Sequence, residues 1–77
     1  KRLISLNIAG TRMKSLKYIQ GLNNLEKLYI NNTRIKSLKP IIELSKLMLL
    51  QCYNTSIRSS RVEEFKISHP QTEVVFY

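Results

Sequence analysis

Apolar residues recur along the chain with a step of 22 positions. Blocks that begin at Leu3, Leu25 and Leu47 agree in five columns: leucine in the first and fourth, apolar residues in the sixth and eleventh, and threonine in the ninth. After the first column, the shared columns are Leu6, Leu28 and Leu50; Ile8, Ile30 and Cys52; Thr11, Thr33 and Thr55; and Met13, Ile35 and Ile57. Agreement of several columns in one phase indicates an internal structural repeat.

The two halves of each block follow different periods. In the first half, apolar residues alternate with other types, as at Leu28 and Ile30, which predicts a short strand with one face inward. In the second half, apolar residues recur every third position, as at Leu38 and Ile41, which predicts a 3₁₀ or single-turn helix. Pro40 suits the first turn of such a helix, where a missing N–H costs nothing.

No single block can bury its apolar stripe alone. Successive blocks are therefore expected to stack and to pair their strands in parallel. Crossovers between parallel strands are right-handed. The sequence thus predicts an α/β fold, a right-handed solenoid with short parallel strands along one side and short helical turns along the other.

The blocks read L-x-x-L-x-I-x-x-T-x-[IM] and resemble the leucine-rich repeat family, in particular its 22-residue, internalin-like bacterial class, which often carries a proline where Pro40 stands. The resemblance implies strands on a concave face, 3₁₀ or α turns on a convex face, and a scaffold for protein–protein recognition with no enzymatic activity. Repeats are expected at about 3–24, 25–46 and 47–58, with a C-terminal cap at 59–77. Because threonine replaces the family's asparagine in the ninth column, we expect that turn to depend less on hydrogen bonds and more on packing.

The last twenty residues depart from the repeat. Ser60 and Glu63 have the spacing of a capping box, which predicts a helix that begins at about Arg61 and ends before Pro70. Its inward side is expected to carry Val62, Phe65 and Ile67. The tail 73–77 is β-prone and predicts a final edge strand. Either Val74 and Phe76 or Val75 and Tyr77 face the core, since a slip of one residue exchanges the two faces.

The beginning of the chain has no comparable closure. Leu3 and Leu6 start a repeat directly, and Lys1 and Arg2 cannot cover a row of leucines. We therefore expect the chain to be the C-terminal piece of a longer array, with upstream repeats of the same parent chain as its neighbours. The alternative is a short protein that self-associates through its open N-terminal end.

Length and composition narrow the function. Seventy-seven residues fit one small domain. One cysteine and one histidine exclude an internal disulfide and a four-ligand zinc site, and neither a metal nor a cofactor is expected. Cys52 falls in an inward column, which predicts an inert buried thiol rather than a nucleophile. No apolar run approaches the length of a membrane span, and one buried cysteine suits either redox compartment.

The outward positions of the strands form the first candidate site. Tyrosine and leucine there offer apolar area of the kind enriched in interface hot spots, although cross-strand pairing alone can also select them. On the strength of the resemblance we favour binding of another protein. The candidate residues are Lys27, Tyr29, Asn31, Leu49, Gln51 and Tyr53.

Basic residues form the second candidate site. The chain carries 13 lysines and arginines against five glutamates, for a net charge of +8. Eight of these cations fall in three columns after the strands: Arg12 and Arg34; Lys14, Lys36 and Arg58; and Lys17, Lys39 and Arg61. They suggest a module that binds nucleic acid or an anionic surface. We favour a solvated flank, because no aromatic residues interleave with the ladder to stack on bases. A third alternative is a structural cap for a larger repeat protein.

Overall fold

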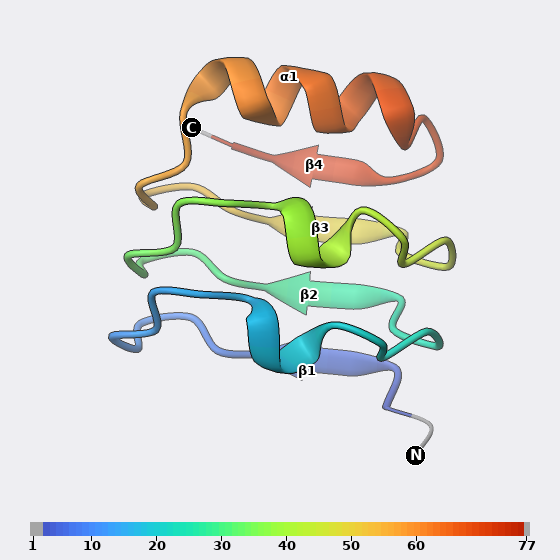
Figure 1. The fold of residues 1–77 in the computed structure, drawn as a ribbon, viewed down its shortest axis with the longest axis horizontal. Coiled ribbons are helices and arrows are strands. Elements are labelled where there is room, and N and C mark those ends of the chain that lie inside the picture. The colour runs from blue at the N-terminus through green and yellow to red at the C-terminus, as the bar shows by residue number, and fades with distance from the viewer. Residues whose placement is uncertain (1–2, 77) are drawn as a thin grey trace.

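The computed structural model describes residues 3–76 and contains one parallel sheet of four short strands. The strands follow chain order: β1 (Ser5–Asn7), β2 (Lys27–Tyr29), β3 (Leu49–Gln51) and β4 (Glu73–Val75). Leu28 pairs with Leu6 on one side and with Leu50 on the other. The predicted stacking of the leucine column is therefore confirmed, and Figure 1 shows the resulting stack of coils.

Each strand and the segment that leads from it to the next strand form one coil of the solenoid, and we call that segment the return path. Two single-turn 3₁₀ helices lie on the return paths of the first two coils. They are η1 (Lys17–Ile19) and η2 (Lys39–Ile41), and Pro40 lies in the first turn of η2 as predicted. A serine lies two residues before each of these helices. The hydroxyls of Ser15 and Ser37 accept hydrogen bonds from the N–H groups of Lys17 and Lys39, at 3.0 and 3.2 Å. Ile19 and Ile41 face the core. Strands on one side and 3₁₀ turns on the other make the solenoid that the sequence predicts.

The core is a column of apolar side chains enclosed by the coils. Leu28, Ile30, Leu50 and Cys52 are fully buried. Their counterparts in the first coil, such as Leu6, are only partly buried, because that coil has a neighbour on one side alone among residues 3–76. Burial of each coil therefore depends on both of its neighbours.

The turns after β1, β2 and β3 are held by the threonine column, Thr11, Thr33 and Thr55. The hydroxyl of Thr33 donates to the carbonyl oxygen of Ile30 at 2.7 Å and accepts the N–H of Ile35 at 3.5 Å. Thr11 and Thr55 make the same two bonds in their own coils. The expectation of a turn with fewer hydrogen bonds is therefore wrong, because one hydroxyl serves as donor and acceptor within a single coil.

The position before each threonine has a left-handed backbone. Gly10, Asn32 and Asn54 have φ of 76°, 59° and 53°. Glycine and asparagine are the residues that tolerate this region, so the sharp bend after the strand fixes their identity. The Asn54 side-chain amide also donates to Asn32 Oδ1 at 2.6 Å, which links two adjacent coils.

Helix α1 (Ser59–Ser68) covers the end of the stack beside β4, as Figure 1 shows. The predicted capping box is wrong: the helix begins two residues earlier than Arg61, Arg58 occupies the N-cap position, and no side chain caps it. Ser60 and Glu63 lie inside the helix. Ile67 is also not inward, since it is 80% exposed. It lies only two residues after the buried Phe65, about 200° around the helix.

His69 ties the helix to the second coil. Its Nε2 lies 2.6 Å from the carbonyl oxygen of Ile42, and because a carbonyl only accepts, this nitrogen donates. The imidazole ring stacks on Phe65 with 4.0 Å between ring centroids. Thr72 adds a second link, with its hydroxyl donating to the carbonyl oxygen of Leu47 at 2.6 Å. The C-terminal segment is thus fastened to the coils by polar bonds as well as by packing.

Strand β4 settles which residues of the tail face inward. Val74 pairs with Leu50 in the inward column, and both Val74 and Phe76 pack against the core. Val75 pairs with Gln51 on the opposite face. Tyr77 lies outside the described residues.

Leu28→Ala is expected to lower the free energy of unfolding by about 2–5 kcal/mol, because it leaves a cavity in the fully buried column. Chemical denaturation followed by circular dichroism measures the loss. Leu6→Ala makes the same chemical change in the partly buried first coil and should cost less. Equal losses for the two variants would contradict the stacked core.

Thr33→Val keeps the shape of the side chain and removes its hydroxyl. It should cost about 1–3 kcal/mol, since it leaves the carbonyl of Ile30 and the N–H of Ile35 without their partner. Thr11→Val removes the same bonds at an exposed position, where water replaces them. In chemical denaturation, Thr33→Val should therefore have a clearly lower free energy of unfolding than Thr11→Val.

Candidate partner-binding surface

The outward side chains of the four strands lie in two columns on one surface. We call this surface the strand face. In-register parallel pairing places successive residues of a column about 4.8 Å apart, the spacing of neighbouring strands. Its members are Ser5, Lys27, Leu49 and Glu73 in one column and Asn7, Tyr29, Gln51 and Val75 in the other.

The middle of the strand face is more apolar than its first strand. Tyr29 and Leu49 are partly buried yet point away from the core, whereas Ser5 and Asn7 on β1 are exposed and polar. Tyrosine and leucine here give a partner apolar area, and the tyrosine hydroxyl adds a hydrogen-bonding group. The middle of the strand face therefore combines apolar area with a hydrogen-bonding group.

Tyr53 lies beside the strand face, just after β3, and its hydroxyl accepts a hydrogen bond from Asn31 Nδ2 at 3.2 Å. Asn31 differs from the expectation of an outward contact residue, since it is only 7% exposed. Its side-chain amide is engaged by Tyr53 of the next coil, so it is not available as an outward contact. Within residues 3–76, Asn31 Oδ1 is buried and has no hydrogen-bond partner. Asn31 thus supports Tyr53 from below the surface.

Glu73 and Val75 belong to the strand face and were missed by the sequence reasoning, which left the faces of the tail open. The 22-residue step itself could have assigned these faces. Continuing the 22-residue step from Leu50 leads to Thr72, which is buried, and alternation from Thr72 then turns Val74 and Phe76 inward. The observed pairing of Leu50 with Val74 is displaced by two residues, which leaves the faces unchanged.

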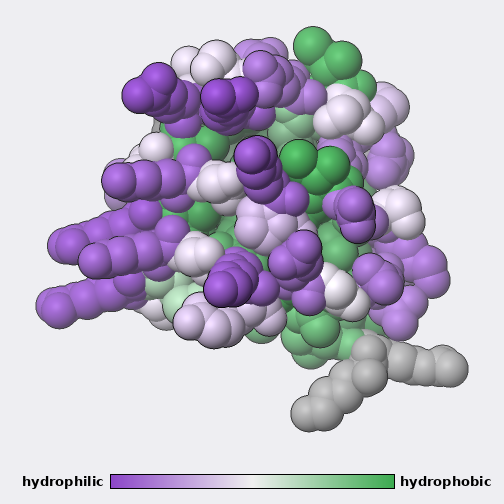
Figure 2. All heavy atoms as spheres, in the orientation of Figure 1, coloured by the Kyte–Doolittle hydropathy of each residue, from purple (hydrophilic) through white to green (hydrophobic). Residues whose placement is uncertain are grey.

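The eight cations that fall in three columns after the strands, which we call the basic ladder, lie on another part of the surface. All eight of its predicted residues are exposed, and Figure 2 shows hydrophilic side chains projecting on the left, over the loops that follow the strands. Within the described part of the chain, the one ladder residue in an ion pair is Arg61, whose Nη1 lies 3.3 Å from Glu64 Oε1. The ladder is therefore a largely uncompensated row of positive charge. Its members are Arg12, Lys14, Lys17, Arg34, Lys36, Lys39, Arg58 and Arg61.

The groups with possible chemical reactivity are separated from each other. Cys52 is fully buried, and this burial raises the pKa of its thiol to about 11, while Lys66 acts in the opposite direction. Instead, Nε2 of His69 donates to the carbonyl oxygen of Ile42, and Nδ1 lies 3.0 Å from the Ser68 hydroxyl. Residues 3–76 bring together no three histidine, cysteine, aspartate or glutamate side chains that could hold a metal ion. No helix over the same residues is long and apolar enough to span a membrane.

Comparison with known proteins adds one finding. The family model described as Leucine Rich repeats (2 copies) matches residues 1–46. No curated protein matches the chain.

The thiol of Cys52 should resist modification while the chain is folded. At pH 8 a pKa of about 11 leaves about 100-fold less thiolate than the ordinary value of 9.0, and thiolate is the reactive form. Labelling with a disulfide reagent should therefore be slow in buffer and fast in guanidinium chloride. The neutral thiol favours folding below about pH 9, and this contribution is lost as the pH rises toward about 11. Rapid labelling of the folded chain would show that Cys52 is accessible.

Proposed function

The chain belongs to the leucine-rich repeat family, and from this premise we propose that it is a protein-recognition module that docks a partner on its strand face. Leucine-rich repeat domains generally mediate protein–protein interactions and are typically not enzymes. The 22-residue step and Pro40 favour the internalin-like class as its subtype.

The observation that carries the proposal is the grouping of Tyr29, Leu49 and Tyr53 on and beside the strand face. The core beneath these side chains is already filled by Leu28, Leu50 and Cys52, so the part of their apolar area that stays exposed is open to a partner. Tyrosine is enriched in the few residues that supply most of the binding energy of an interface. The bond from Asn31 to Tyr53 holds one of these rings before a partner arrives, which lowers the entropy lost on binding.

Around these anchors the strand face is mixed in charge. Lys27 on β2 and Glu73 on β4 stand in the same column on either side of Leu49. A partner therefore meets a central apolar area between a positive and a negative group. Such an arrangement selects the orientation of a partner more than it raises affinity.

The ladder supports a second candidate, a module that binds an anionic surface or nucleic acid. Eight exposed cations with one carboxylate partner among residues 3–76 give a surface that counterions must screen. Tyr18, which follows Lys17, is exposed, but the equivalent positions after Lys39 and Arg61 hold Pro40 and Val62. The ladder therefore offers a single ring and no repeated platform for stacking bases. For this reason we place the ladder second to the strand face.

Tyr29→Ala and Tyr53→Ala should each weaken binding at the strand face by about 30-fold, equivalent to about 2 kcal/mol at a hot spot. The probes are cyclic peptides taken from a display library by selection for binding to the chain. Such selection favours the surface whose side chains contribute most binding energy. Surface plasmon resonance measures each affinity. Far-UV circular dichroism should remain unchanged, because neither side chain fills the core.

Tyr18→Ala is the matched control, because Tyr18 lies on η1 and is 82% exposed. Most selected peptides should bind this variant as well as they bind the original chain. Peptides that depend on Tyr18 but not on Tyr29 or Tyr53 would contradict the proposal. Affinity that falls steeply with salt, and that disappears on charge reversal of Lys14, Lys36 and Arg58, would assign recognition to the ladder instead.

A further inference from the structure

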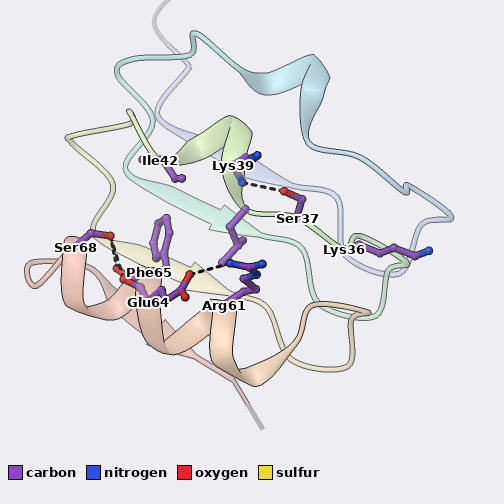
Figure 3. Close-up of a pocket in the computed structure, with 9 residues that line it drawn as sticks. Lys36, Ser37, Lys39, Ile42, Arg61, Glu64, Phe65 and Ser68 are labelled. Carbon is purple, nitrogen blue, oxygen red and sulfur yellow. Dashed lines mark hydrogen bonds and ion pairs between the residues drawn. The ribbon is translucent and has the colours of Figure 1, made fainter.

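A groove of about 730 Å³ opens between the second coil and α1. It exists because the chain enters a helix after Ile57 in place of a third 3₁₀ turn, so the regular stacking of the return paths is interrupted. Figure 3 shows Phe65 pointing from α1 toward the second coil and Ile42 facing the groove from the opposite wall. The groove lies on different elements from the strand face.

The floor and the rim of the groove differ in chemistry. Leu38 and Phe65 form an apolar floor and are themselves almost fully buried, while Ile42 is 49% exposed. The rim carries three cations, Lys36, Lys39 and Arg61, against the single carboxylate of Glu64, which is already paired with Arg61. In Figure 3 Arg61 and Glu64 lie together on the helix side, whereas the side chain of Lys36 extends outward from the opposite wall. The cations thus come from both walls and do not converge on one point.

We propose that this groove binds a short acidic peptide segment of another protein. Separated cations complement carboxylates spaced along a chain better than a single compact anion. The exposed side of Ile42 and the apolar floor complement a hydrophobic side chain between those carboxylates. A volume of about 730 Å³ is within the range of sites that enclose a small ligand. The net charge of +8 favours encounter with an acidic segment.

Other anionic partners fit the groove less well. Single-stranded nucleic acid needs exposed rings for base stacking, and Phe65, the one aromatic residue in the lining, is only 3% exposed and stacked on His69. An anionic membrane is flat and would contact the whole ladder, including Lys17, which is outside the groove lining. Charge complementarity together with an apolar floor therefore favours a peptide.

The test uses an octapeptide that alternates aspartate and leucine, labelled for fluorescence anisotropy against the full 77-residue chain. The peptide should bind, whereas the same peptide with lysine for aspartate should not. Serine for leucine should weaken binding about tenfold, because it removes the apolar contact. Absence of binding up to about 1 mM of the chain would overturn the proposal.

Paired variants distinguish the groove from the general positive charge. Lys39→Glu should weaken binding about tenfold, whereas Lys17→Glu, the equivalent first residue of η1, should change it less than about twofold. Ile42→Ser should likewise weaken binding, and Ile67→Ser, a change at an exposed isoleucine outside the groove lining, should not. Equal losses for Lys17→Glu and Lys39→Glu, or no loss for Ile42→Ser, would overturn the proposal. Tighter binding of oligodeoxythymidine, or of vesicles containing phosphatidylserine, would also overturn it.

Discussion

Each interior coil is buried only because parallel pairing places Leu28 directly between Leu6 and Leu50. A strand of three residues is too short to be stable alone, so its stability comes from the coils on either side. The same register fixes both faces of the sheet. Once the leucine column points inward, Tyr29 and its neighbours must point outward, and the surface offered to a partner follows from the packing of the core.

The register could not persist without a turn that repeats. A left-handed residue followed by threonine closes the bend after each of the first three strands, and the hydroxyl satisfies one carbonyl and one N–H of its own coil. These bonds lie within a coil, whereas backbone bonds at the same bend join neighbouring coils, such as the bond from the N–H of Asn32 to the carbonyl oxygen of Tyr53 at 3.1 Å. The contact between Asn32 and Asn54 then adds a bond between coils at the same bend. Bonds within a coil shape its turn, and sheet pairing together with apolar burial joins the coils.

The sequence predicts the features that repeat, since a column with one role leaves the same signature in every block. The strands, the 3₁₀ turns, the position of Pro40 and the burial of Cys52 were all predictable in this way. The C-terminal segment occurs once, and there a local motif was misleading: the spacing of Ser60 and Glu63 suggested a cap, but the helix begins at Ser59. The burial of Asn31 was missed because it goes with a contact to Tyr53 in the next coil, which residue type does not reveal. The groove was missed because it depends on how closely α1 approaches a coil about one repeat earlier in the chain.

Repetition and its interruption have different consequences for recognition. In a regular stack, equivalent cations such as Lys17 and Lys39 have equivalent surroundings, and a row of them attracts anions without selecting among them. Where α1 replaces the third 3₁₀ turn, that equivalence ends: Lys39 borders the groove, and Lys17 does not. The bond from His69 to Ile42 fixes the helix at this distance, so the groove is set by the same contacts that close the core. Selectivity on this side of the molecule therefore arises where the repeat stops.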